Sequence, residues 1–259
     1  MHDASAFVGN WPFVDTAECT LERVKADLRE AGLSGAAFSP AEAVLHPEPM
    51  AANERLFAAA AAGGDAFRVV LVPVINPSLA TWREHLQACL VHGGERVRGV
   101  KILPNYHVYS LSETFVGELA RELAGRGLTL CIQMRMYDER SHHPLMKVPG
   151  VAAAEIARLA GEHPGLKILA CGAYMRELGE FRTAPNLYAE MSFAESGRTL
   201  EAALEALPAE RLLLGTHAPL HYPLAGVVKA QSDEVPAVVR ERIASGNFLH
   251  VFGPAERRG

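Results

Sequence analysis

At 259 residues, of which 49% are hydrophobic, the chain is long enough for one large α/β domain over residues 1–259 with a sizeable core. The formal net charge of −5 offers no basic surface for nucleic acid or an anionic membrane, which leaves small molecules or proteins as the expected partners. No apolar run reaches the roughly 20 residues of a membrane-spanning helix and no signal-peptide pattern opens the chain, so a cytoplasmic location is expected.

Apolar runs that end at glycine or proline predict eight strands. They lie near residues 5–8, 35–38, 68–75, 99–103, 128–134, 166–170, 186–191 and 211–214. Helical patterns separate them, near residues 20–31, 50–62, 79–92, 113–125, 151–161, 174–180 and 199–206, and a last helix is expected near 235–244. Eight buried strands alternating with helices favour a closed (β/α)8 barrel, the TIM barrel. An open doubly wound sheet is the alternative, but residues 8–12 lack its glycine-rich phosphate loop.

Polar side chains gather where several of these strands end, which in a barrel is the end that carries function. His217 directly follows the eighth strand, and Tyr106 and His107 follow the fourth. Side chains alternate across a strand, so a second set is expected to point toward the barrel axis: Lys101, Gln133, Arg135, Cys171 and Glu190. Each has a plain alternative, because Lys101 and Glu190 could form a structural ion pair, Gln133 could bind backbone groups and Cys171 could be inert packing.

The loop after the fifth strand, residues 135–144, is rich in charge and imidazole. Arg135 and Arg140 could bind a carboxylate or phosphate through two parallel hydrogen bonds, with Asp138 orienting one of them. The alternative is an ordinary solvated loop. His217 and His221 have the i,i+4 spacing of some zinc sites, but Pro219 between them argues against a continuous helix, so that pair is weak evidence for a metal.

Five segments together resemble the amidohydrolase superfamily, in its amidohydrolase-related (amidohydrolase 2) branch of metal-dependent hydrolases and decarboxylases. The resemblance covers nearly the whole chain, through residues 3–9, 99–104, 167–172, 213–219 and 246–252. It implies a (β/α)8 barrel and an enzyme. It also implies metal-binding histidines at positions where this chain has Ser5, Phe7, Gln133 and Cys171, and an aspartate where it has His217.

This substitution pattern predicts a degenerate metal site, because serine and phenylalanine cannot replace imidazole ligands. We expect no cofactor, with one divalent metal, zinc, as the alternative. Its weak candidate ligands are His107, Cys171 and His217, joined by Glu190 or His142. Lys101 could also be carbamylated to bridge two metals, as in some members of the superfamily, but that idea loses force without the histidines.

The functional expectation is an amidohydrolase-related hydrolase or decarboxylase acting on a small, carboxylate-bearing substrate at the carboxyl end of the barrel. His217 is the expected general acid or base because imidazole titrates near neutral pH, and Lys101 is expected to stabilise developing negative charge. His107 would relay a proton and Glu190 would orient His217 or Lys101. Substrate contacts are expected from Tyr106, Gln133, Arg135, Asp138, Arg140 and Cys171.

Two other hypotheses stay open. One is a small-molecule-binding barrel that has lost catalysis, and the other is a metalloenzyme with rearranged ligands. A homodimer is the commonest assembly for such proteins. The residues do not name the substrate or choose between hydrolysis and decarboxylation.

Overall fold

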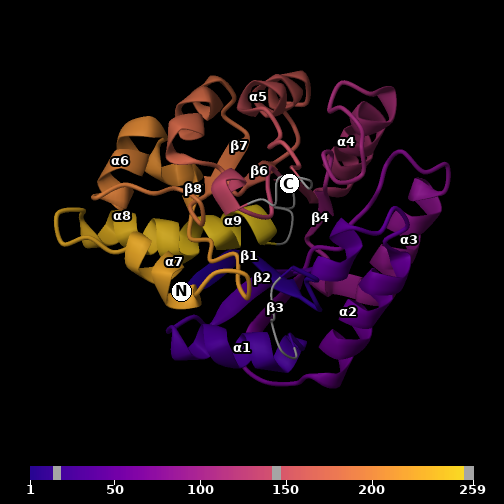
Figure 1. Cartoon of the computed structure of the whole chain (residues 1–259), viewed down its shortest axis with the longest axis horizontal. Coiled ribbons are helices and arrows are strands. Elements are labelled where there is room, and N and C mark those ends of the chain that lie inside the picture. The colour runs from indigo at the N-terminus through magenta and orange to yellow at the C-terminus, as the bar shows by residue number, and fades with distance from the viewer. Residues whose placement is uncertain (14–18, 142–146, 254–259) are drawn as a thin grey trace, which may run out of the picture.

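The computed structural model describes residues 1–13, 19–141 and 147–253. Within these ranges the strands alternate with helices, and the helices surround the strands (Figure 1). All paired strands are parallel. The strands are β1 (His2–Val8), β2 (Gly35–Pro40), β3 (Arg68–Leu71), β4 (Gly99–Ile102), β5 (Thr129–Gln133), β6 (Ile168–Cys171), β7 (Leu187–Glu190) and β8 (Leu212–Leu213).

The regular ladders form two groups, β1-β2-β3 and β4-β5-β6-β7-β8, and backbone hydrogen bonds cross both seams between them. At one seam, Ala4 N–H donates to the Leu214 carbonyl (2.9 Å) and His217 N–H donates to the Ser5 carbonyl (3.0 Å). At the other seam, Lys101 N–H donates to the Pro73 carbonyl (2.8 Å). The strands therefore follow one another in the order of the expected (β/α)8 barrel, and the site residues of β1, β4 and β8 lie beside these seams.

The α-helices lie close to the expected ranges in the first two thirds of the chain. They are α1 (Leu21–Glu30), α2 (Met50–Ala62), α3 (Trp82–Gly93), α4 (Thr114–Arg126), α5 (Ala153–Glu162), α6 (Thr199–Ala206), α7 (Pro223–Lys229), α8 (Ala237–Glu241) and α9 (Asn247–Phe252). Thr20 caps α1 by accepting a hydrogen bond from Arg23 N–H (3.3 Å), and Gly127 ends α4 at φ +68°. Among the described residues, no helix is long and apolar enough to cross a membrane.

The helical segments differ from expectation near the end of the chain. Residues expected as a helix at 174–180 form the 3₁₀ helix η4 (Met175–Thr183). Helix α7, which the sequence reasoning missed, begins with Pro223 in its first turn, where the absent proline N–H costs nothing. The helix expected at 235–244 continues from α8 through the π-helical turn η6 (Arg242–Gly246) into α9 and ends at Phe252. The remaining short 3₁₀ helices are η1 (Ala41–Val44), η2 (Gly94–Arg96), η3 (Glu139–Ser141) and η5 (Ala209–Arg211).

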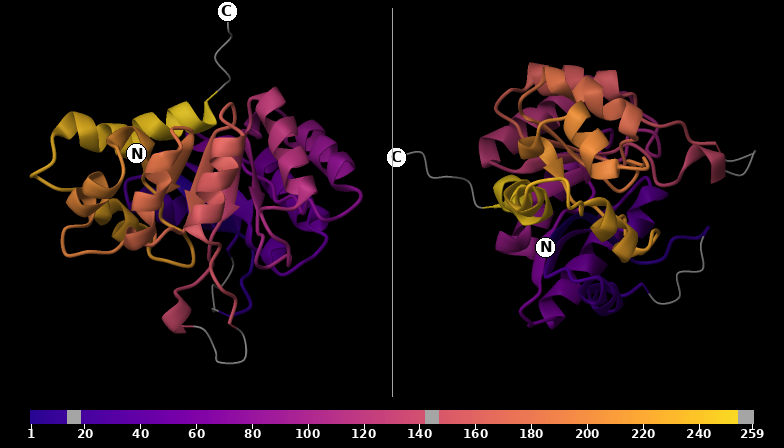
Figure 2. Two further views of the ribbon diagram at one scale, coloured as in Figure 1. Left: turned by 90° about the horizontal axis from the view of Figure 1, so that it is seen from above. Right: turned by 90° about the vertical axis from the view of Figure 1, so that its left-hand side faces the viewer.

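Helix α9 covers one end of the barrel. Its apolar side chains join a buried cluster with inward residues of seven strands: Ala4, Ala37, Val70, Val72, Cys131, Leu169, Cys171, Tyr188, Leu213, Phe248, Val251 and Phe252. The Thr129 hydroxyl at the start of β5 donates to the Val251 carbonyl (2.7 Å), which ties α9 to the sheet. In Figure 2, α8 and α9 lie across one end of the strands, and η3, in the segment that follows β5, lies beyond the other end. We call that second end, where the carboxyl ends of the strands lie, the mouth.

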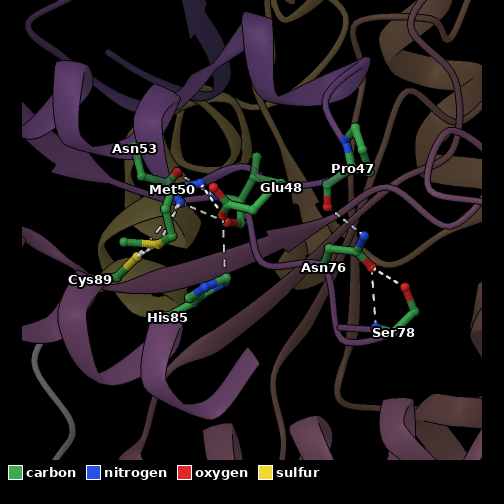
Figure 3. A network of polar contacts seen from close by, with 9 residues as sticks. Pro47, Glu48, Met50, Asn53, Asn76, Ser78, His85 and Cys89 are labelled. Atoms are coloured by element: carbon green, nitrogen blue, oxygen red, sulfur yellow. Dashed lines mark hydrogen bonds and ion pairs between the residues drawn. The ribbon is translucent and has the colours of Figure 1, made fainter. Parts of the chain in front are cut away.

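Buried polar side chains hold the segment after β3 in place. Within the expected strand 68–75, regular pairing ends at Leu71. Asn53 of α2 then binds the backbone of Val74, accepting from its N–H (2.9 Å) and donating to its carbonyl (2.8 Å). In the same network, Asn76 donates to the Pro47 carbonyl (2.8 Å) and accepts from the Ser78 hydroxyl (2.7 Å) (Figure 3). These contacts fix the loop between β3 and α3 at the mouth.

Candidate active site

Lys101 of β4 lies in the barrel interior with only 2% of its surface exposed. Its ammonium group donates to Gln133 Oε1 (2.9 Å) and Ser5 Oγ (3.4 Å) and lies 4.1 Å from the centre of the Phe7 ring. Gln133 in turn donates to the Arg135 carbonyl (2.8 Å). Lys101 and Gln133 therefore meet in the interior as expected, whereas the Arg135 side chain does not join them. The three N–H bonds of the lysine have two hydrogen-bond acceptors and an aromatic face as partners.

Asp3 supplies a buried carboxylate that the sequence reasoning missed. Oδ1 accepts from the N–H groups of Ser5 (3.0 Å) and Thr216 (2.9 Å), and the Thr216 hydroxyl donates to Oδ2. Burial raises the pKa of Asp3, and these hydrogen bonds and the charge of Lys101 oppose the rise. The available signal was that Asp3 is the one acidic residue of β1, although this does not reveal its partner. Asp3 joins β1 to the segment after β8 and so fixes the residue just before His217.

Glu190 of β7 is fully buried and does not orient Lys101 or His217 through a hydrogen bond. Its carboxylate accepts from Ser192 N–H (2.6 Å), from the Ser192 hydroxyl (2.9 Å) and from Gly172 N–H. Burial raises the pKa of Glu190, and the negative charge of Asp3 adds to the rise. The side chain therefore holds together the segments that follow β6 and β7.

Cys171 of β6 points into the same interior and is fully buried. Its Sγ lies 3.8 Å from the Leu169 carbonyl oxygen. A hydrogen bond from Cys131 lowers the pKa of Cys171, and the charge of Lys101 acts in the same direction. Burial raises the pKa of Cys131 well above its ordinary value. The two thiols thus form part of the buried layer around Lys101, away from the surface pocket described below.

His217 is fully buried just beyond β8. Nε2 lies 2.9 Å from the Met136 carbonyl oxygen, which can only accept, so Nε2 carries a proton and Nδ1 has a free lone pair. Among the described residues, Nδ1 has no hydrogen-bond partner. The ring packs edge-on against Phe7 (5.1 Å between centroids) and Phe193 (4.9 Å). Burial lowers the pKa of His217 well below its ordinary value, and nearby His221 and Lys101 lower it further.

Arg135 is buried and engaged by a carboxylate of this same chain. Its Nη1 and Nη2 donate to the two carboxylate oxygens of Glu177 on η4 (2.8 and 2.6 Å), and Nη1 also donates to the Gly172 carbonyl. The guanidinium carbon lies 3.9 Å from the centre of the Tyr174 ring. The side chain has the paired geometry expected for a substrate carboxylate, but Glu177 occupies it.

A pocket of about 420 Å³ lies at the mouth, between the segments that follow β5, β7 and β8. Its lining residues are Asp138, Arg140, Ser141, Phe193, Glu195 and His221. Arg140 is well exposed, and its Nε and Nη2 donate to the two oxygens of Asp138 (2.8 and 2.7 Å). This ion pair holds the pKa of Asp138 down at about 2. Hydrogen-bond donors, a carboxylate pair, an aromatic wall and an imidazole therefore share one cavity.

Tyr106 and His107 lie on a different side of the mouth. His107 Nε2 lies 3.0 Å from the Ala43 carbonyl oxygen, and burial lowers the pKa of His107. Tyr106 packs against Trp11 (6.3 Å between ring centroids), and burial raises its pKa to about 12. Both adjoin an apolar cluster that covers the polar interior on the mouth side: Phe7, Trp11, Ala41, Ala43, Val44, Ala52, Val74, Leu103 and Met136.

The residues present do not fit a divalent metal at the barrel centre. The Lys101 ammonium group and the Phe7 ring fill the space between the strands, and a cation there would meet a positive charge and a phenyl face. Within residues 1–13, 19–141 and 147–253, no group of three or more His, Cys, Asp or Glu side chains could hold a metal ion. His142, a candidate ligand, lies outside the described residues.

Comparisons with known structures give the same fold. The chain is 17% identical to 5-carboxyvanillate decarboxylase from Sphingomonas paucimobilis (TM-score 0.70), covering 97% of this chain and 98% of that one. It is 12% identical to an amidohydrolase from Burkholderia multivorans (TM-score 0.71, covering 97% and 98%). It is 17% identical to a dihydroxybenzoic acid decarboxylase from Polaromonas sp. JS666, solved with manganese and the inhibitor 2-nitroresorcinol (TM-score 0.69, covering 97% and 96%).

No curated protein matches the chain. A family model described as "Amidohydrolase" matches residues 5–253, which is nearly the whole sequence and includes Lys101, Gln133, Cys171, Glu190 and His217 but not Asp3. The (β/α)8 order of the strands agrees with that match. The chain therefore belongs to the amidohydrolase family.

Proposed function

We propose that the protein is an enzyme that acts on a small carboxylate-bearing substrate, by decarboxylation or hydrolysis, in the pocket at the mouth. One observation carries the proposal: buried His217 packs directly behind the pocket in which Arg140, Phe193 and His221 meet. A cation for an acid group, an aromatic wall for a ring and a proton-transfer group behind them are the parts that such a reaction needs.

Arg140 is the proposed carboxylate-binding residue. Two of its N–H groups bind Asp138, which fixes the plane of the guanidinium, and Nη1 has no hydrogen-bond partner among the described residues. An arginine held in this way can donate charge-assisted hydrogen bonds to an incoming acid at little further cost in side-chain entropy. Arg135 is not given this role because Glu177 already binds it.

His217 is the proposed general base, through the lone pair of Nδ1. Its lowered pKa keeps the ring neutral at neutral pH, so that Nδ1 can accept a proton, and the Met136 carbonyl then stabilises the imidazolium through Nε2–H. Lys101 does not reach the pocket lining and acts through space, as a buried positive charge that favours negative charge developing nearby. Gln133 and Ser5 hold that charge in place.

The substrate class follows from the chemistry of the pocket and is supported by the structural relatives. Phe193 offers an aromatic face beside the cation. Two of the relatives are decarboxylases whose names give aromatic acids, 5-carboxyvanillate and dihydroxybenzoic acid. We therefore propose a hydroxylated aromatic carboxylate as the first substrate class to test. The proposed reaction draws only on side chains of this chain, and no step is assigned to a metal.

A second candidate is a small-molecule-binding barrel without catalysis. The observation in its favour is that the charged groups of Lys101 and Glu190 are both engaged by internal partners, as purely structural buried groups would be. It shares the pocket and the carboxylate ligand with the first candidate but predicts binding without turnover.

The test is an assay of CO2 release and of ester, lactone or amide hydrolysis over a panel of hydroxybenzoic acids and their derivatives. The first candidate predicts turnover, a raised KM in Arg140→Ala because the carboxylate loses its cation, and unchanged kinetics in Arg158→Ala, a surface arginine on α5. Binding of panel acids with no turnover would favour the second candidate. Turnover with an unchanged KM in Arg140→Ala would remove the carboxylate assignment.

A further inference from the structure

His221 is the imidazole that the pocket exposes. It lies one turn after His217, with its N–H donating to the His217 carbonyl (3.2 Å), and it is half-buried. Its ring lies 5.0 Å from the His217 ring and 4.7 Å from the Phe193 ring, measured between centroids. In the sequence, the i,i+4 spacing of His217 and His221 was only weak evidence for a metal site. In the structure, a single turn brings the two imidazoles into contact.

His217 itself does not line the pocket. It is fully buried, with Phe193 and His221 packed against its ring, so any molecule in the pocket meets His221 before it can reach His217. The Nδ1 of His217 is a buried acceptor without a partner among the described residues. A buried acceptor without a partner lowers the stability of the fold. At an active site such an acceptor is available to receive a proton.

We propose that His221 is the catalytic residue that meets the substrate and that it passes the proton to His217, an inference that rests on the proposed function. One ring nitrogen of His221 takes a proton from the substrate or from an attacking water. The N–H on its other nitrogen, which contacts the His217 ring without a hydrogen bond in the structure, turns toward Nδ1 of His217 and passes its proton there. His221 stays neutral, His217 becomes imidazolium with Nε2–H still bound to the Met136 carbonyl, and the substrate gains the matching negative charge. Reversal of the same steps returns the proton to the product.

The charges and burial around the two rings keep both rings neutral before a proton is taken up. Burial lowers the pKa of His221, Lys229 lowers it further, and the carboxylates of Glu195 and Asp138 oppose that effect. Arg140 lies in the same pocket. Around His217 the neighbouring groups are His221 and Lys101. Both rings are therefore neutral at neutral pH, which is the state in which a relay can accept a proton.

The kinetic test uses His221→Ala, with His92→Ala on the exposed side of α3 as the matched control. His221→Ala is expected to lower kcat about 100-fold or more, with little change in KM, and the control is expected to keep wild-type values. Free imidazole added to His221→Ala is expected to restore turnover, because the truncated side chain leaves room beside the pocket. Thermal melting of both variants checks that the fold is retained. Wild-type kcat in His221→Ala, or loss of kcat that imidazole does not restore in a folded variant, would overturn the proposal.

A second measurement does not depend on turnover. ¹⁵N NMR of the histidine rings is followed while benzoate and 2,6-dihydroxybenzoate are added to the wild-type protein. The proposal predicts that the His221 resonances shift on ligand addition and that those of His92 do not. Unmoved His221 resonances at saturating ligand would overturn it. If the wild-type protein turns over no acid of the panel but His221 shifts, the proposed function fails while His221 remains the ligand-facing imidazole.

Discussion

His217 donates its Nε2–H to the carbonyl of Met136 at 2.9 Å, and this one contact sets the tautomer of a fully buried ring. The residue has φ +58°, a left-handed conformation that asparagine tolerates better than most side chains. We therefore predict that His217→Asn folds but loses about 100-fold or more in kcat, because no group with an imidazole pKa remains behind the pocket. Circular dichroism and steady-state kinetics check the two parts. A folded variant with full activity would remove His217 from the mechanism.

The buried histidine also makes stability depend on pH. Above pH 6.5 His217 is neutral in both the folded and the unfolded chain, but below it only the unfolded chain takes up the proton, because burial has lowered the folded-state pKa. The free energy of unfolding therefore falls as the pH drops below about 6.5, at up to ~1.4 kcal/mol per pH unit for this residue.

The check compares urea unfolding of wild type and His217→Asn at about pH 7.5 and pH 5.5. Other histidines with lowered pKa values, among them His2 at about 4, contribute to both proteins and leave the comparison intact. The variant is expected to lose less stability on acidification than the wild type. Equal losses would mean that His217 takes up its proton equally in the folded and the unfolded state.

Only glycine fits at position 215, beside Glu190. A Cβ at position 215 would lie 2.0 Å from Glu190 Oε2 and 2.7 Å from Cδ, and Glu190 is held by its bonds to Ser192 and Gly172. Gly215→Ala is therefore expected to lower the free energy of unfolding by about 1–3 kcal/mol or more. Gly161→Ala in α5, where a Cβ meets nothing within 4 Å, is the control and is expected to be neutral or stabilising by up to about 1 kcal/mol. Equal melting temperatures for the two variants would contradict the packing argument.

Removing the charge of Lys101 is expected to lower the free energy of unfolding far more than removing a surface charge does. Lys101→Met leaves Gln133 Oε1 without its donor and the buried Asp3 without its nearby cation, and we expect a loss of about 3 kcal/mol in unfolding free energy. Arg158→Met breaks an exposed helical ion pair with Glu162 and is expected to cost about 0.5 kcal/mol or less. Denaturant unfolding of both variants measures the contrast, and a Lys101→Met protein as stable as wild type would refute a charge role for this lysine.

Chelation is expected to leave the protein unchanged. Because an ammonium group and a phenyl ring fill the barrel centre, we predict less than one equivalent of transition metal in protein purified without chelator, and no change in melting temperature after dialysis against EDTA. Elemental analysis and calorimetry are the measurements. One tightly bound equivalent whose removal lowers the melting temperature would instead support the rearranged metal site.

Much of the fold is predictable because the short apolar strands stop at residues with a clear local effect. Gly215 follows the end of β8, and Gly127 ends helix α4 in the same way. The alternation of side chains along β5 correctly places Ile132 and Met134 in the outer core and Cys131 toward the axis. Helix α7 was missed because no helical pattern was assigned between residues 214 and 235, although Pro223 is well suited to the first turn of a helix.

The candidate site was less predictable because its decisive contacts join segments far apart in the sequence. The sequence around Arg135 is typical of a substrate-binding arginine. In the structure, Glu177 of η4, which lies 42 residues later in the chain, binds its guanidinium. The pairing of Asp3 with Thr216 spans 213 residues, and nothing near either residue in the sequence signals it. His221 was set aside with the metal hypothesis, since the sequence does not reveal that one turn stacks it against His217.

Binding of the substrate acid in the pocket at the mouth underlies every role proposed for these side chains. A crystal structure of the protein with a bound hydroxybenzoic acid tests this binding. The predicted result has the carboxylate within hydrogen-bond distance of Arg140, the ring against Phe193 and an imidazole nitrogen of His221 facing the ligand. The contradicting result would have the acid elsewhere, for example in the groove of about 750 Å³ at the far end of the barrel between Tyr188 and Arg242, or bound to a metal in place of the Lys101 ammonium group.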